Sequence, residues 1–213
     1  MNTTRSINMQ KRRERILAEA RAVLSSKGFE ALNLRDLADL AGVTVPTIYN
    51  LIGNKEEVLN ALMLGTFDDF EDELVKQLPC PAAGLPELMA DTLLGMIKGD
   101  QAFYRAAALA NERAETTNKV AGGYGITRIT IKRIFSDLCQ TLLEEGLLKG
   151  DINQATLAEQ MTNNHQVIMR DWARRIISLD EFRAQSLTGF YVTLAADAVA
   201  TFHDELASRL RAS

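Results

Sequence analysis

The chain has 213 residues, of which 46% are hydrophobic and 24% charged, proportions typical of a globular protein. Its net charge of −4, taken alone, argues against a nucleic-acid partner, and the distant pair Cys80 and Cys139 suggests neither a zinc site nor a disulfide scaffold. The N-terminus has no apolar signal segment and no apolar run approaches the ~20 residues of a membrane span, so we expect a cytoplasmic protein with no membrane partner, metal or cofactor.

The chain has only four prolines and no convincing strand pattern, which predicts an all-α fold. Residues 1–8 are expected to form a flexible basic arm. A first helix is expected from near Met9 to Lys27, where Gly28 is suited to end it in the left-handed conformation.

Two short helices follow, at 34–41 and 45–51, joined by a tight turn at Gly42. Asn33 is suited to cap the first of them, and Pro46 lies in the first turn of the second, where a missing N–H does no harm. Two short helices joined in this way form a helix-turn-helix pattern, here at residues 33–52.

The remaining sequence predicts longer helices. A connecting helix at 56–77 leads to a proline-rich loop at 78–86, where a second region begins. We expect a DNA-binding domain at 9–55 and a C-terminal helical domain at 84–213. Its helices are expected at 86–98, 101–118, 124–146, 154–177 and 180–210.

Charge is unevenly distributed along the chain. Residues 1–55 have a net charge of +4, whereas the other 158 residues have a net charge of −8. A basic head on an acidic body is expected when only one end of a protein meets phosphate.

The second helix of the pattern has the features of a helix that enters a major groove. Ile48 and Ile52 lie four residues apart and are expected to face inward. The outward residues are then Val45, Pro46, Thr47, Tyr49 and Asn50, with Thr44, Arg35 and Lys55 near helix N-termini, where phosphate is favoured. The pattern alone leaves DNA binding open, because other helical proteins have such turns.

Residues 13–63 resemble the N-terminal domain of TetR-family regulators. The resemblance rests on Gly28-Phe29, Arg35-Asp36-Leu37-Ala38, Ala41-Gly42-Val43, Pro46-Thr47-Ile48-Tyr49 and Asn54-Lys55-Glu56. It implies that Arg35, Thr44, Thr47, Tyr49 and Lys55 contact DNA, with Tyr49 and Lys55 on phosphates and Val45, Pro46 and Thr47 at base edges. It also implies a palindromic operator, a homodimer made by the helices at about 154–177 and 180–210, and a small-molecule effector bound in the C-terminal bundle.

The sequence departs from the family pattern at three positions. Leu51 stands where similar sequences have Tyr or His, so one backbone anchor is lost, and Ile52 replaces a larger Phe. Val45 offers no hydrogen bond, so base reading there would be apolar, as with a thymine methyl group.

Several residues have two readings. Arg5, Lys11, Arg12 and Arg13 could reach the adjacent DNA backbone or minor groove, or belong to a disordered, solvated tail. Six residues are candidates for the effector pocket, with plain core or interface packing as the alternative: Tyr104, Arg105, Asn111, Cys139, His165 and Trp172. The acidic run 68–73 is expected to be a solvated helix face rather than a cation site.

The main hypothesis is a ligand-responsive DNA-binding regulator that acts as a repressor. A helical enzyme is disfavoured because the chain has only two histidines and no nucleophile elbow or metal cluster. A helical adaptor that keeps the helix-turn-helix shape without binding DNA is the third hypothesis, and it would show no salt-dependent DNA binding.

Overall fold

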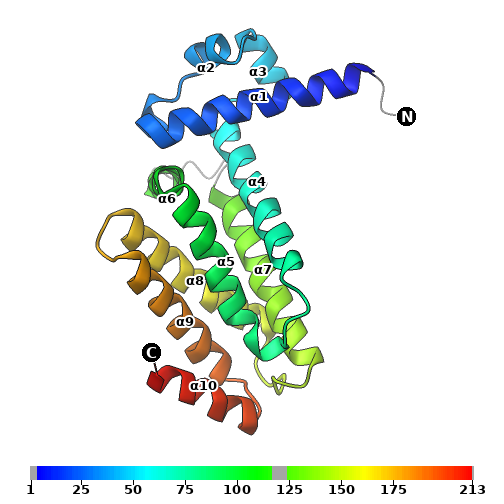
Figure 1. Cartoon of the computed structure of the whole chain (residues 1–213), viewed down its shortest axis with the longest axis vertical. Coiled ribbons are helices and arrows are strands. Elements are labelled where there is room, and N and C mark those ends of the chain that lie inside the picture. Colours follow the sequence, from blue (N-terminus) through cyan, green and yellow to red (C-terminus); the bar gives the residue numbers. More distant parts are fainter. Residues whose placement is uncertain (1–3, 117–123, 213) are drawn as a thin grey trace. The chain divides into compact units, whose positions relative to one another are not determined.

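The computed structural model describes residues 4–116 and 124–212 (Figure 1). Within these ranges the chain forms ten α-helices, two 3-10 turns and no strand beyond one isolated bridge, which confirms the all-α fold class. The helices are α1 (Thr4–Lys27), α2 (Leu34–Leu40), α3 (Val45–Leu51), α4 (Lys55–Lys76), α5 (Leu85–Gly99), α6 (Gln101–Thr116), α7 (Tyr124–Glu144), α8 (Gln154–Ala173), α9 (Leu179–Ala195) and α10 (Ala200–Ala212), and the 3-10 turns are η1 (Phe29–Ala31) and η2 (Ala82–Gly84).

The chain divides into two compact units. The first unit comprises Met1–Asp68 and Asp100–Thr127, and the second comprises Asp69–Gly99 and Arg128–Ser213. No helix in the described part of the chain combines the length and the apolar character that a membrane crossing requires.

The first unit is organised around α1, which packs against α2, α3 and α6 (Figure 1). Ile16, Ala20 and Leu24 of α1 are fully buried at helical spacing, together with Ile48 of α3. This core holds α2 and α3 against one face of α1. The positions of the two short helices are therefore fixed by packing rather than by their own marginal stability.

Helix α1 is longer than the sequence predicts. It begins at Thr4 instead of near Met9, so residues 4–8, assigned to a basic arm, are helical in this structure. Ser6, Ile7 and Asn8 are exposed, so they extend the helix without adding to its buried face.

The second unit is a bundle in which α9 packs against α5, α8 and α10. Trp172 of α8 is completely buried and meets the edge of Phe182, with ring centroids 6.1 Å apart. Phe135 of α7 packs edge-on against Phe190 of α9 at 5.4 Å. Aromatic contacts of this kind bury large surfaces and favour one arrangement of the helices.

The predicted helix at 180–210 is wrong, because the chain breaks there into α9 and α10. Asp197 is buried at the break, and its carboxylate accepts hydrogen bonds from the backbone N–H groups of Gly150, Asp151 and Ile152, each at 3.0 Å. Its own carbonyl accepts from Lys149 N at 2.8 Å. This anchor to a distant loop ends a segment whose alanines would otherwise continue the helix.

The predicted helix at 154–177 also ends early. α8 stops at Ala173, where Arg175 adopts a positive φ of 62° and the N–H groups of Arg174 and Arg175 close the last turn. The last four residues of the predicted helix, 174–177, belong to the connection to α9.

Candidate nucleic-acid interface

Local hydrogen bonds set the start of α2 and the turn that follows it. Asn33 caps α2 by accepting a hydrogen bond from Asp36 N at 2.9 Å. Gly42 has a φ of 58°, a conformation that glycine adopts without strain, and Val43 N donates to Ala38 O at 2.9 Å to close the turn. Arg15 of α1 reaches this turn and donates to Gly42 O at 3.3 Å.

Helix α3 starts and ends on equally local signals. Thr44 occupies the N-cap position with extended backbone, and its hydroxyl lies 2.8 Å from that of Thr47. Pro46 lies in the first turn. The helix ends at Ile52 and Gly53, whose N–H groups both bond to Ile48 O.

Ile48 anchors the inward face of α3, and Ile52 contributes less to it. Ile48 is fully buried, as its spacing predicts, whereas Ile52 is only half-buried. Because Ile52 sits at the C-cap, outside the regular helix, its side chain does not continue the buried stripe.

The outward face of α3 is open. Tyr49 is 56% exposed, Pro46 and Asn50 are exposed, and Val45 and Thr47 are partly exposed. Thr44 and Arg35 of α2 are also exposed. In the described part of the chain Arg35 has no ion pair or hydrogen bond through its side chain. The structure therefore brings these predicted residues to the outer surface of the two short helices.

Lys55 has partners that the sequence analysis did not foresee. Its ammonium lies 4.4 Å above the ring of Phe29 and donates to Glu30 O at 3.3 Å. These contacts leave two of its N–H groups for another acceptor. They also hold the start of α4 against η1 within the first unit.

A capping box that the sequence also contains marks the start of α4. Asn54 N donates to Glu57 Oε2 at 2.7 Å, and Glu57 N donates to Asn54 Oδ1 at 2.9 Å. The signal was present in the sequence as Asn54 followed three residues later by Glu57.

Comparison with known proteins agrees with this geometry. Residues 16–62, which include α2 and α3, match the model of a family described as bacterial regulatory proteins, tetR family. Within this segment the chain is similar to the tetR family. No curated protein sequence matches it.

Solved structures of TetR-family regulators have the same fold. A protein from Rhodococcus sp. described as a TetR-family transcriptional regulator aligns over 87% of this chain and 99% of its own, with a TM-score of 0.69 and 17% identity. SmeT, the repressor of the Stenotrophomonas maltophilia multidrug efflux pump SmeDEF, aligns over 89% and 92%, with a TM-score of 0.65 and 18% identity. FadR, a fatty acid degradation regulator from Bacillus halodurans, aligns over 85% and 94%, with a TM-score of 0.64 and 17% identity. The chain thus has the same fold as these three regulators.

The six candidate pocket residues lie in both units. Tyr104, Arg105 and Asn111 belong to α6 in the first unit, where Tyr104 is buried edge-on against Phe103 at 5.4 Å. Arg105 and Asn111 are partly exposed.

The other three candidates, Cys139, His165 and Trp172, belong to the second unit. Cys139 is fully buried, and burial raises the pKa of its thiol to about 12, with a smaller contribution from the charge of Asp197. His165 meets the edge of Phe135 at 6.0 Å, and loss of hydration lowers the pKa of its imidazole to about 4. A neutral thiol and a neutral imidazole, like the buried Trp172, suit uncharged surroundings.

Proposed function

We propose that this chain is a homodimeric TetR-family repressor that binds a palindromic operator and releases it when a small-molecule effector binds in the C-terminal helical domain. The DNA-binding domain would span residues 9–55, the connecting helix 56–77 and the effector and dimerisation domain 84–213. We expect it to act in the cytoplasm, where the DNA is.

The observation that supports DNA binding most strongly is the division of α3 into two faces. Ile48 is fully buried against the first unit, whereas Tyr49 and Asn50, the next two residues, are exposed. A short helix that is fixed on one side and open on the other fits a major groove roughly 12 Å wide.

The exposed residues divide into two proposed roles. Tyr49, Lys55 and Thr44 would donate to phosphates, and Arg35 would reach the backbone or a base edge. Val45, Pro46, Thr47 and Asn50 would face the bases. Thr47 and Asn50 alone among these four offer hydrogen bonds, so sequence preference at the other two positions would come from apolar contacts such as a thymine methyl group.

Dimerisation would use α8 and α9, which pack against each other and each keep an exposed stripe. Val167 of α8 is 46% exposed and Val192 of α9 is 58% exposed, next to exposed residues spaced three or four apart: Asn163 on α8, and Ala184 and Thr188 on α9. Small and apolar side chains on neighbouring helices allow a second pair of helices to approach closely. Two copies are needed because successive major grooves recur about 34–36 Å apart.

A repressor role and an effector are supported by analogy of fold. SmeT is a repressor of an efflux pump, and FadR regulates fatty acid degradation. An effector acts only through a difference in its affinity for the two conformations of the regulator. We propose Tyr104, Arg105, Asn111, Cys139, His165 and Trp172 as the first residues to test for contact with it.

A gel-shift assay with the protein's own upstream DNA, repeated over a salt series, tests the DNA-binding role. We expect affinity to fall steeply as salt rises, since phosphate contacts release counterions. Tyr49→Ala and Lys55→Ala should weaken binding to all duplexes alike, whereas Thr47→Ala should change the preference among sequences.

Leu40→Ala is the matched control for Tyr49→Ala. Leu40 lies on α2 and is 55% exposed, close to the 56% of Tyr49, and it has no proposed DNA contact. Binding by the wild type that does not respond to salt would favour the adaptor hypothesis. A thermal-shift screen with metabolites and hydrophobic drugs, followed by the gel shift with each hit, tests release by an effector.

A further inference from the structure

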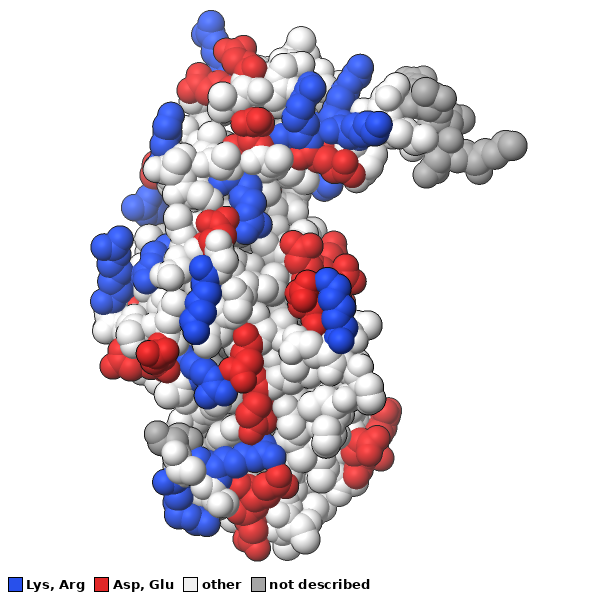
Figure 2. Space-filling view, viewed as in Figure 1, with Lys and Arg blue, Asp and Glu red and all other residues white. Residues whose placement is uncertain are grey.

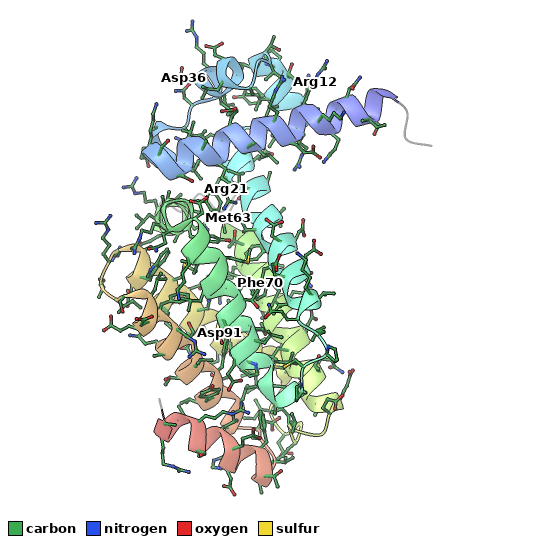
Figure 3. The ribbon with its side chains drawn as sticks, viewed as in Figure 1. Arg12, Arg21, Asp36, Met63, Phe70 and Asp91 are labelled. Atoms are coloured by element: carbon green, nitrogen blue, oxygen red, sulfur yellow. The ribbon has the colours of Figure 1, made fainter. Side chains whose placement is uncertain are left out.

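A groove runs between the N-terminal half of α1 and helix α3, beside the residues of α3 that are proposed to contact DNA. It consists of two hollows of about 560 and 500 Å³. Asn8, Arg12 and Thr47 line both hollows, so the two are continuous around Arg12. Figure 3 shows Arg12 on α1, on the side where α3 lies.

The α1 wall of this groove is basic and has no acidic counterpart. Lys11, Arg12 and Arg15 line the first hollow, and none of the described residues that line either hollow is acidic. Lys11 and Arg12 are exposed and make no ion pair or side-chain hydrogen bond with any described residue. Figure 2 shows Lys and Arg side chains gathered beside the N-terminal residues of the chain. Their positive charge is available to a partner from outside.

Arg15, unlike Arg12, makes a side-chain hydrogen bond within the described part of the chain. Its guanidinium donates to Gly42 O at 3.3 Å and so ties α1 to the turn between α2 and α3. Because Arg15 is three residues from Arg12, both lie on the same face of α1. Arg12 and Arg15 therefore line the same hollow beside α3.

The α3 wall supplies hydroxyl groups. The hydroxyls of Thr44 and Thr47 lie 2.8 Å apart, so one donates to the other. The hydroxyl that accepts keeps its own hydrogen free to donate into the groove. Cations on one wall and a free O–H donor on the other suit a phosphate oxygen, which accepts several charge-assisted hydrogen bonds.

We propose that this α1–α3 groove binds a backbone phosphate of the DNA strand next to the one read by α3, with Arg12 as its main cation. The inference rests on the proposed DNA-binding function, and it extends the contact surface from α2 and α3 to α1. Leu51 also lines the second hollow, and its side chain offers no hydrogen bond to a phosphate. A continuous strand is favoured over a small anion because the groove is open along its length.

The test compares Arg12→Ala with Lys27→Ala, at the other end of α1. Lys27 has the same charge as Arg12 and is also exposed, but it lines neither hollow. The probe is a labelled duplex of about 30 base pairs, long enough for two half-sites, recovered by the wild type from a random library. Dissociation constants are measured between about 50 and 200 mM KCl.

We expect Arg12→Ala to weaken binding about tenfold and to reduce the slope of log K against log salt by about one. Lys27→Ala should leave that slope unchanged, and Arg12→Lys should restore it because the charge is kept. Thermal unfolding of each variant checks that the first unit remains folded.

Neutral methylphosphonates placed singly along the duplex locate the contact. At the phosphate that Arg12 contacts, the neutral substitution should weaken DNA binding by the wild type. It should not weaken DNA binding by Arg12→Ala any further. Wild-type DNA affinity that does not change with salt concentration would overturn the proposed function itself. A wild type that responds to salt, together with equal slopes for Arg12→Ala and Lys27→Ala, would overturn only the groove.

Discussion

The polar side chains around α3 and those of the second unit differ in their partners. Around α3 in the first unit, Arg12 and Arg35 are exposed and have no ion pair with any described residue, and Tyr49 is exposed beside them on α3. In the second unit several arginines join helices. Arg183 of α9 bonds twice to Asp91 of α5, at 2.5 and 3.0 Å, and Arg128 of α7 pairs with Glu159 of α8.

This difference separates residues that are available to bind a partner from residues that stabilise the fold. A cation that is left unpaired on a fixed surface contributes to encounter with an anionic partner rather than to stability. A cation that bridges two helices contributes to their arrangement. Substitutions around α3 should therefore change DNA affinity at constant stability, whereas substitutions inside the second unit should change stability first.

The largest effect is expected from Trp172→Ala. Trp172 is completely buried against Phe182, and removal of its ring leaves a cavity in the second unit. We expect the free energy of unfolding to fall by about 3–5 kcal/mol, measured by urea denaturation followed by circular dichroism. Trp172→Phe, which keeps a ring, should lose much less.

A small loss in Trp172→Ala, of about 1 kcal/mol or less, would contradict the role in the core. It would instead favour the alternative in which Trp172 lines an open effector pocket. The same measurement thus decides between the two readings of this residue that the sequence left open.

The sequence predicts the first unit better than the second because the signals there are local. Thr44, Pro46 and Gly53 lie within or beside α3 and set its limits, so the predicted helix 45–51 is confirmed residue for residue. The break after α9 depends on Asp197, whose partners lie 45 to 47 residues earlier in the chain. The residues that neighbour Asp197 in the sequence do not identify these partners.

The same distinction applies to the site. The exposure of Tyr49 and the burial of Ile48 follow from helical spacing alone. The contact of Lys55 with Phe29 and Glu30 and the groove between α1 and α3 need the folded first unit, because their members are 25 or more residues apart. Helical periodicity predicts which residues share one face of a helix. Tertiary packing determines which other residues contact that face.

A smaller effect is expected from Arg209→Ala in α10. Arg209 donates to Ala83 O at 2.7 Å and pairs with Glu87 at 2.8 Å, and Tyr191 donates to the same Glu87 oxygen at 2.5 Å. The second oxygen of Glu87 is buried without a hydrogen bond to any described residue. Loss of Arg209 leaves this carboxylate less well compensated.

We expect Arg209→Ala to lower the free energy of unfolding by about 1–2 kcal/mol, since the side chain is partly screened by solvent. Arg211→Ala is the matched control, because Arg211 is exposed on the same helix and should change stability by less than about 0.5 kcal/mol. The fluorescence of Trp172, the chain's single tryptophan, reports the transition. Equal losses in the two variants would show that the bridge to α5 adds nothing to stability.

The smallest effect concerns the pH dependence contributed by His165. Its pKa is lowered from 6.5 to about 4 in the folded chain, because its imidazole loses hydration beside Phe135. Between these two values the unfolded chain binds a proton that the folded chain does not. Stability should therefore be fully present above pH ~6.5 and decline as pH falls towards 4, by at most about 1.4 kcal/mol per pH unit.

His165→Phe removes this contribution and keeps an aromatic ring beside Phe135. Both proteins share every other titratable group, so the difference between their unfolding free energies, followed from about pH 7 to pH 5, isolates His165. We expect this difference to shift in favour of the variant as the solution becomes more acidic. A difference that stays constant would mean that the folded chain binds the proton as readily as the unfolded one, and that this side chain faces solvent rather than the interior of the second unit.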